Sequence, residues 1–181
     1  MRPTLTRRGA LGGAAALALA SCGGGDPPPT GGPRAGSGAG LLNSIVALEH
    51  AAIAAWAAIA EVLTGDARRY ARTIRERELA NAERVAGLVR KLGGTPPRTR
   101  PDAEYARLFP RMETEADALH FARDLEDRLV RAYLEGLRLL PDPEQRRAAA
   151  EIAAEQAEDL AVVHALAGDP AAPQPFVTGT L

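Results

Sequence analysis

The stretch RERELANAERV, residues 75–85, decides how this chain folds. Glu78 and Asn81 continue a stripe whose members recur at steps of three and four, as on one face of an α-helix. The full stripe is Ile74, Glu78, Asn81, Val85, Leu88 and Leu92. Both polar side chains therefore point the way that the core residues point. Because a buried carboxylate is costly without a partner, the two residues belong either to a site or to the remains of one.

The rest of the chain indicates three further helices of the same kind. Alanine, leucine, arginine and glutamate dominate residues 41–167, and no segment there alternates polar and apolar residues with period two. The predicted helices cover 41–64, 66–92, 114–140 and 143–167. Their expected N-caps include Asp66, Thr114 and Asp142, with Pro143 in a first turn and Gly93 at a helix end.

The connections between these helices predict their arrangement. The first and last connections are only a few residues long, so each joins an antiparallel helical hairpin. The middle connection has about twenty residues rich in proline and glycine, which is long enough to run along a bundle. We therefore predict an all-α fold, an antiparallel four-helix bundle made of two hairpins joined by a long crossover.

Each predicted helix carries polar residues on its buried stripe. They are Glu49, Glu78, Asn81, Glu126, Gln156 and Asp159. Glu49 lies 29 residues before Glu78, and Glu126 lies 30 residues before Gln156, so the two hairpins repeat one arrangement. At a rise of ~1.5 Å per residue, the positions of these side chains along the bundle axis agree to within about one helical turn. We expect all six to meet near the middle of the bundle.

This pattern resembles the ligand set of ferritin-like dinuclear carboxylate proteins, a Glu from each of two helices and a Glu-x-x-His pair from each of the other two. The segments ALEHAAIAAWAAI and ARDLEDRLVRAYLEGL, the LGG after the second helix, and the tail PAAPQPFVTG also resemble exported ferritin-like domains common in actinobacterial sequences. The resemblance covers residues 41–179. It implies a ferritin-like bundle with a dinuclear iron or manganese site for metal or oxidant handling, such as iron oxidation or peroxide removal.

The sequence departs from that ligand set at three of the six positions. Asn81 and Asp159 stand where the family has histidines, and Gln156 stands where it has a glutamate. The metal ligands that the resemblance implies are Glu49, Glu78, Glu126 and Asp159, with Asn81 and Gln156 as further oxygen ligands. Because no nitrogen ligand remains, such a set would prefer hard ions such as Mn, Mg or Ca. The histidines of the chain, His50, His120 and His164, fall off the stripe, and we expect them on helix surfaces or beside the site.

Two interpretations of the polar positions stay open. With two divalent ions, the four carboxylates would be neutral overall. Without metal, they cannot all stay ionised in a low-dielectric core, and the amides of Asn81 and Gln156 could bond them in a buried polar network. Oxidoreductase activity of ferritin-like type therefore stays undecided, with the altered ligands favouring its loss. The alternative function is a metal-free structural or interaction module at the cell envelope.

The N-terminal segment predicts export and lipid attachment. Arg7 and Arg8 precede a short Gly/Ala/Leu run that ends at Cys22, as in a twin-arginine signal. Leu19–Cys22 resembles the bacterial lipobox, whose cysteine is lipidated; the alternative is a free thiol. Residues 1–22 are then a lipoprotein signal, 23–40 a Gly/Pro-rich flexible linker, 41–168 the bundle and 169–181 a C-terminal tail. This predicts a protein held by lipidated Cys22 at the extracytoplasmic face of the cell membrane.

Composition excludes several other functions. Cys22 is the only cysteine, so no intrachain disulfide can form. Without Arg2, Arg7 and Arg8, the 22 basic residues fall to 19 against 23 acidic ones, and this mildly acidic balance argues against nucleic-acid binding. The chain has no nucleophile elbow, phosphate loop or cysteine pair, which sets aside conventional hydrolase and kinase chemistry. The partners we expect are the membrane and either a second copy or an envelope protein.

Overall fold

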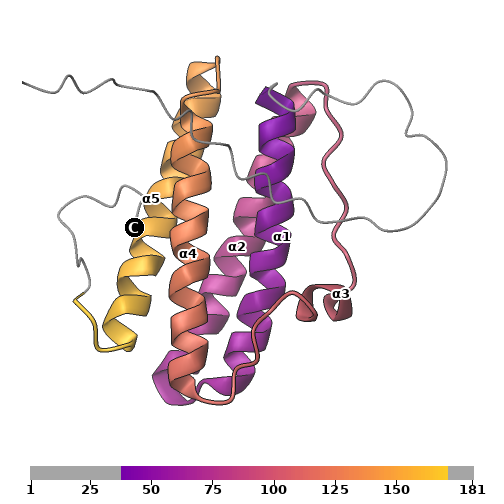
Figure 1. The fold of residues 1–181 in the computed structure, drawn as a ribbon. Helices are drawn as coiled ribbons and strands as arrows, with labels where there is room; N and C mark the ends of the chain where they lie inside the picture. The colour runs from indigo at the N-terminus through magenta and orange to yellow at the C-terminus, as the bar shows by residue number, and fades with distance from the viewer. Residues whose placement is uncertain (1–37, 171–181) are drawn as a thin grey trace, which may run out of the picture. The chain divides into compact units, whose positions relative to one another are not determined.

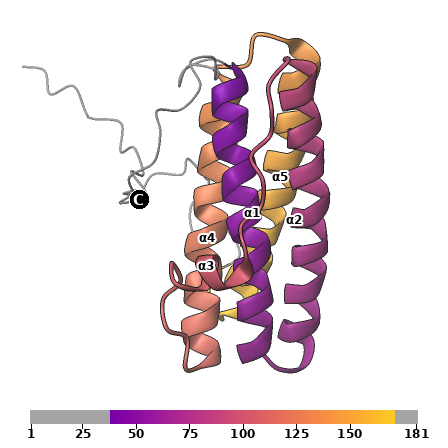
Figure 2. The same cartoon turned by 90° about the vertical axis from the view of Figure 1, so that its right-hand side faces the viewer.

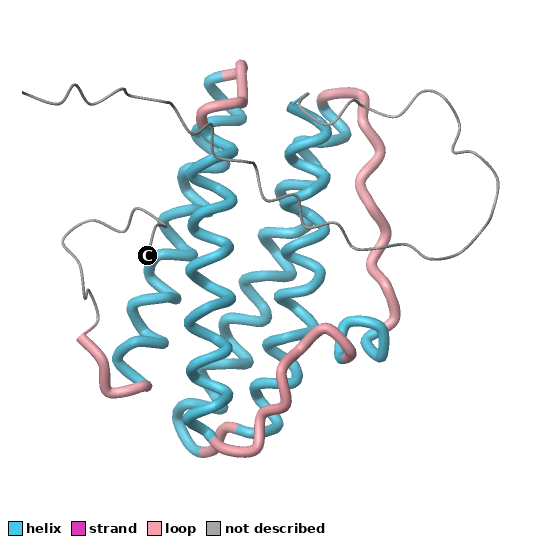
Figure 3. The backbone as a smooth tube through the Cα atoms, in the orientation of Figure 1, coloured by secondary structure: helices cyan, strands magenta, loops and turns pink. Residues whose placement is uncertain are grey.

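The computed structural model describes residues 38–170, which lie within one compact unit. This part of the chain contains helices and no strand (Figure 3). The helices are α1 (Gly38–Val62), α2 (Gly65–Lys91), α3 (Asp102–Ala106), α4 (Glu115–Leu137) and α5 (Pro143–Leu166). The predicted all-α fold is confirmed. Cys22 and nearly all of the predicted linker and tail lie outside the described residues.

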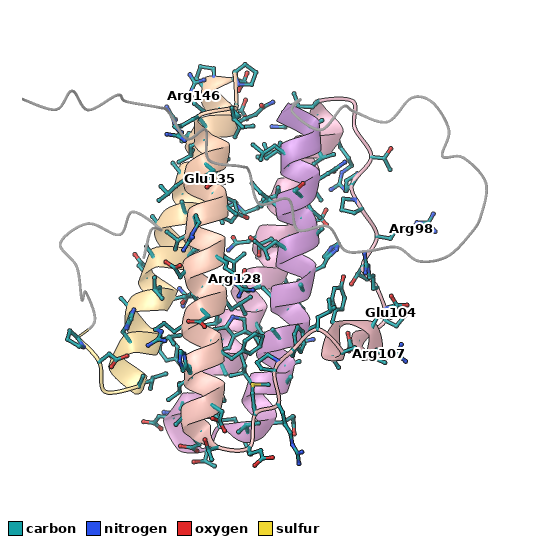
Figure 4. All side chains as sticks on the ribbon, viewed as in Figure 1. Arg98, Glu104, Arg107, Arg128, Glu135 and Arg146 are labelled. Atoms are coloured by element: carbon teal, nitrogen blue, oxygen red, sulfur yellow. The ribbon has the colours of Figure 1, made fainter. Side chains whose placement is uncertain are left out.

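The four long helices form the predicted antiparallel bundle (Figure 1). α1 packs along α2 and α4 packs along α5, so each predicted hairpin is present. α1 and α4 join the hairpins, whereas α2 and α5 approach each other less closely. Charged side chains such as Arg128 and Glu135 of α4 remain exposed on the outside of the bundle (Figure 4).

The crossover between α2 and α4 runs along the outside of α1 (Figures 1 and 2). Asn43 of α1 donates its side-chain N–H to the Thr95 carbonyl at 3.1 Å, which holds the crossover in place. The crossover also contains the short helix α3, which the sequence analysis did not predict. α3 packs on α1 and buries Tyr105, whose hydroxyl accepts the Arg100 backbone N–H at 3.1 Å.

The helix that carries Glu126 begins as predicted. The Thr114 hydroxyl accepts the Asp117 backbone N–H at 3.1 Å, and the Asp117 carboxylate accepts the Thr114 backbone N–H at 2.9 Å. This reciprocal capping box fixes the first turn of α4. Asp142 caps α5 in the same position, since its carboxylate accepts the Gln145 backbone N–H at 3.0 Å.

The prediction that Asp66 caps the second helix was wrong. Thr64 is the residue with extended backbone before α2, and its carbonyl accepts the first helical bond, from the Arg68 N–H at 3.1 Å. Asp66 instead lies in the first turn, where a negative charge is favourable near the helix N-terminus. The other end of α2 is as predicted, because Gly93 follows it with a φ of 73° that only glycine adopts readily.

The hydrophobic core consists of two clusters. One joins the C-terminal half of α1, the N-terminal half of α2, much of α4 and the C-terminal end of α5, and contains Trp56, Ile59, Leu63, Ile74 and Leu129. The other joins the opposite ends of the same four helices, and contains Leu42, Val46, Val85, Tyr133 and Ile152. The polar residues of the buried stripes separate the two clusters on α1, α2 and α5.

α1 is the one helix within residues 38–170 that is long and apolar enough to cross a membrane, judged by length and composition. Half of its apolar stretch is already buried inside the bundle. It also holds Glu49, which is fully buried. Its apolar character is that of a core helix.

Candidate functional site: a buried carboxylate layer

The structure buries all six polar residues of the helix stripes. Glu49, Glu78, Glu126 and Gln156 are completely inaccessible, Asp159 is 1% exposed and Asn81 is 2% exposed. We call these six residues the carboxylate layer. Charged residues are almost never fully buried unless they are paired, so the partners of each carboxyl group decide what the layer can do.

Two aromatic side chains bond the glutamates of α1 and α4 in a crossed arrangement. Trp56 of α1 donates its indole N–H to Glu126 Oε1 of α4 at 2.7 Å. Tyr133 of α4 donates its hydroxyl to Glu49 Oε1 of α1. Each aromatic residue lies seven positions, about two turns, after the glutamate of its own helix. Because α1 and α4 run antiparallel, each reaches the glutamate of the opposite helix.

Two further donors bond the carboxyl groups of α2 and α5. Gln156 donates its side-chain N–H to Glu78 Oε2 at 2.9 Å. Arg77 donates its guanidinium N–H to Asp159 Oδ1. The Arg77 side chain is 31% exposed, so it reaches from the surface of the bundle to a buried carboxylate. Each of the four carboxyl groups therefore has one oxygen held by a donor from this chain.

The second oxygens of the three glutamates lack such a donor. No side chain donates a hydrogen bond to Glu49 Oε2, Glu78 Oε1 or Glu126 Oε2, although all three are buried. Two amide atoms of the layer, Asn81 Nδ2 and Gln156 Oε1, are also buried without a hydrogen-bond partner. A buried polar atom without a partner costs about 1–3 kcal/mol. Protons or a cation would remove this cost at the carboxyl oxygens.

Burial raises the pKa of several acids of the layer. The pKa of Glu49 is raised well above its ordinary value by burial and then by its interaction with the neighbouring Glu78. Burial, with the charges of Glu78 and Asp159, raises the pKa of Glu126. Burial raises the pKa of Asp159 to about 7, although Arg77 opposes this. Burial therefore favours the protonated forms of Glu49 and Glu126 and brings the pKa of Asp159 close to neutral pH.

The three histidines lie outside the layer, as their positions in the sequence predict. His120 is exposed, with its Nδ1 3.7 Å from Asp124. His164 lies near the end of α5, 3.6 Å from Asp169. His50 is half-buried, and burial lowers its pKa. None of the three forms a hydrogen bond or ion pair with a residue of the layer within the described part of the chain.

Sequence reasoning missed three residues of the site. Trp56, Tyr133 and Arg77 were not predicted to be part of the site. The repeated seven-residue spacing of Trp56 and Tyr133 from the glutamates is a signal that could have revealed both donors. Arg77 precedes Glu78 and so lies off the buried stripe, and only the structure shows that its long side chain turns inward.

Comparison with known proteins gives two findings and one negative result. A family model described as ferritin-like domain matches residues 37–169. The crystal structure of a conserved hypothetical protein from Mycobacterium tuberculosis is similar, with a TM-score of 0.66 and 18% identity. The match covers 71% of this chain and 96% of that one, and at this identity it supports the fold alone. Comparison with curated proteins gives no significant match.

A dinuclear iron centre of the kind that the sequence resemblance implies does not fit the layer. Iron is well served by imidazole ligands, and the layer contains none. The Arg77 guanidinium is bonded to Asp159, where its positive charge would oppose a metal ion on that carboxylate. Within residues 38–170, no three His, Cys, Asp or Glu side chains are grouped so that they could hold a metal ion as they stand.

The raised pKa values predict an unusual dependence of stability on pH. Between the ordinary carboxyl pKa of about 4 and the folded pKa of Asp159, about 7, the folded layer binds protons that the unfolded chain has released. The contribution of the layer to the free energy of unfolding should therefore fall as pH rises through this range. Urea unfolding at a series of pH values measures the slope.

Glu126→Gln removes one acid whose pKa is raised by burial. The free energy of unfolding of this variant should therefore fall less steeply with pH than that of the parent chain. Glu135→Gln, at an exposed position of the same helix, should leave the slope as it is. Equal slopes in all three proteins would show that the layer does not hold these protons.

Tyr133→Phe should destabilise the domain by about 1–3 kcal/mol, because it removes the donor to a buried oxygen of Glu49 while keeping the ring. Tyr70→Phe is the matched control, since Tyr70 is 36% exposed. Chemical denaturation measures both changes. A loss no larger for Tyr133→Phe than for Tyr70→Phe would contradict a stabilising role for this hydrogen bond.

Proposed function

Because the chain belongs to the ferritin-like domain family, we propose that it is an exported, lipid-anchored member in which the ancestral dinuclear iron or manganese site has become a metal-free polar network. The domain then serves as a structural or interaction module at the cell envelope. One observation carries this proposal. Each of the four buried carboxyl groups accepts a hydrogen bond from a side chain of the same protein.

The network accounts for two of the three departures from the family's ligand set, Gln156 and Asp159, whereas the Asn81 amide nitrogen is buried without a partner. Gln156, in place of a glutamate, supplies a donor to Glu78 and removes one negative charge. Asp159, in place of a histidine, is neutralised by Arg77. Raised pKa values let Glu49 and Glu126 carry protons, so that the buried charge is reduced without metal. A layer of this kind retains the bundle but has lost the ligands for redox chemistry.

The envelope location rests on the N-terminal sequence. Arg7 and Arg8, the short apolar run and Cys22 have the order of a twin-arginine lipoprotein signal. A single acyl chain binds membranes only marginally, so lasting attachment requires the several acyl chains of a bacterial lipoprotein. The domain would then be tethered to the extracytoplasmic face of the membrane, where its surface could meet an envelope protein or a second copy of the chain.

A second candidate function is binding of one hard divalent cation. The buried second oxygens of Glu49, Glu78 and Glu126 favour it, because carboxylate oxygens are the ligands that Mn²⁺, Mg²⁺ and Ca²⁺ prefer. The side chains would have to rotate to bring these oxygens onto one ion.

Metal analysis separates the two candidates. The chain from residue 23 to 181, purified without chelator from cells supplied with iron and manganese, should contain no stoichiometric metal by elemental mass spectrometry. About two equivalents of iron or manganese, lost in Glu126→Ala, would contradict the proposal and assign a working dinuclear site. One equivalent of a hard ion, lost in the same variant, would favour the second candidate.

Lipid attachment has its own test. Cys22→Ser should move the chain from the membrane fraction to the soluble extracytoplasmic fraction, because no acyl chain can then be attached. Ser21→Ala, a small change at the neighbouring residue, should leave the chain with the membranes. Cell fractionation with immunodetection measures both. Continued pelleting of Cys22→Ser with membranes would show that Cys22 is not the anchor.

A further inference from the structure

The facing sides of α2 and α5 carry a ladder of ion pairs. The basic residues are Arg77, Arg84 and Lys91, seven positions apart on α2, and they face Asp159, Glu155, Glu151 and Glu144 on α5. Arg84 lies 3.1 Å from Glu155 and 2.9 Å from Glu151, and Lys91 lies 3.0 Å from Glu144. The ladder links α2 and α5, which approach each other less closely than the other neighbouring long helices do.

One rung of this ladder differs from the others in burial. The carboxylates of Glu144, Glu151 and Glu155 are 79%, 56% and 38% exposed. Exposed pairs of this kind contribute little to the stability of a folded protein. The Asp159 side chain is only 1% exposed, so Arg77 delivers its charge to a carboxylate that water does not solvate. Removing one member of a buried pair leaves the other charge uncompensated, which is strongly unfavourable.

The charge of Arg77 also reaches beyond its direct partner. It lowers the pKa of Glu126 on α4 as well as that of Asp159 on α5, opposing the effect of burial on both. Asp159 is the one acid of the layer with no buried carboxyl oxygen left without a partner. The guanidinium therefore stabilises negative charge at the edge of the layer, as a bound cation would.

We propose that the Arg77 guanidinium has taken over the charge-balancing role of a metal ion in the carboxylate layer and so makes the folded domain independent of metal. Aspartate at position 159, where the family has a neutral imidazole, adds one negative charge to the core. Arg77 supplies one positive charge that is covalently part of the chain and cannot dissociate. This inference rests on the proposed metal-free function and names the residue that makes it workable.

Arg77→Gln tests the inference by removing the charge while keeping a hydrogen-bond donor. At pH 8, the variant in EDTA should melt at a lower temperature than the parent chain. Mn²⁺ should restore its melting temperature, because the released carboxylates gain a cation that binds only the folded state. Equilibrium dialysis should show Mn²⁺ bound to the variant and not to the parent chain.

Two matched variants control for other effects. Arg84→Gln removes an arginine from the same helix and the same ladder, but its partners are exposed carboxylates. Arg77→Lys keeps the positive charge at the buried rung. Both should melt at the same temperature in EDTA and in Mn²⁺, because neither leaves Asp159 without a cation.

The outcomes separate the inference from the proposed function. Stoichiometric Mn²⁺ on the parent chain would contradict the proposed function and the inference with it. A metal-free parent chain with an Arg77→Gln variant that neither binds Mn²⁺ nor is stabilised by it would overturn the inference alone. If Arg77→Gln is unfolded in both conditions, adding Asp159→Asn removes the negative charge as well. The double variant should then fold without metal, and failure to fold would also overturn the inference.

Discussion

The structure depends on one constraint, which is that four carboxyl groups lie in the core of a four-helix bundle. Their burial is complete for the three glutamates and nearly so for Asp159. Without compensation, such groups would prevent the core from forming, because an unpaired charge in an apolar medium is very costly. The indole of Trp56, the hydroxyl of Tyr133, the amide of Gln156 and the guanidinium of Arg77 each supply part of that compensation. The two separate apolar clusters follow from the same constraint, since the layer interrupts the core on three of the four helices.

The two hairpins share one plan, and their differences carry the functional argument. Glu49 with Trp56 on α1 corresponds to Glu126 with Tyr133 on α4, which gives the crossed pair of aromatic donors. The second helices have diverged, with Glu78 and Asn81 on α2 and Gln156 and Asp159 on α5. Glu78 of the first hairpin corresponds to the amide Gln156 of the second, and the amide Asn81 of the first corresponds to the acid Asp159 of the second. Gln156 bonds to Glu78 and Asp159 bonds to Arg77, whereas the Asn81 amide nitrogen has no partner.

The sequence predicted the bundle well because helical periodicity reports which face of a helix is buried. All six polar residues of the layer were found this way, and the caps at Thr114 and Asp142 were found from the residue types that favour helix N-termini. Periodicity does not report which side chains bond across helices, so the donor roles of Trp56 and Tyr133 were missed. Arg77 was missed because a long side chain can enter the core from a backbone position beside the buried stripe. α3 was missed because its five residues follow several prolines, and Asp66 was misassigned because Thr64 was a competing cap two residues earlier.

Under the proposed function, this chain's own donors and protons, and no metal ion, hold the carboxylate layer together. Anomalous diffraction tests this most directly, on crystals of residues 23–181 grown with Mn²⁺ and measured where manganese scatters anomalously. The account predicts no anomalous peak within the layer and electron density that joins Arg77 to Asp159. A peak among Glu49, Glu78 and Glu126, with Arg77 displaced from Asp159, would contradict it.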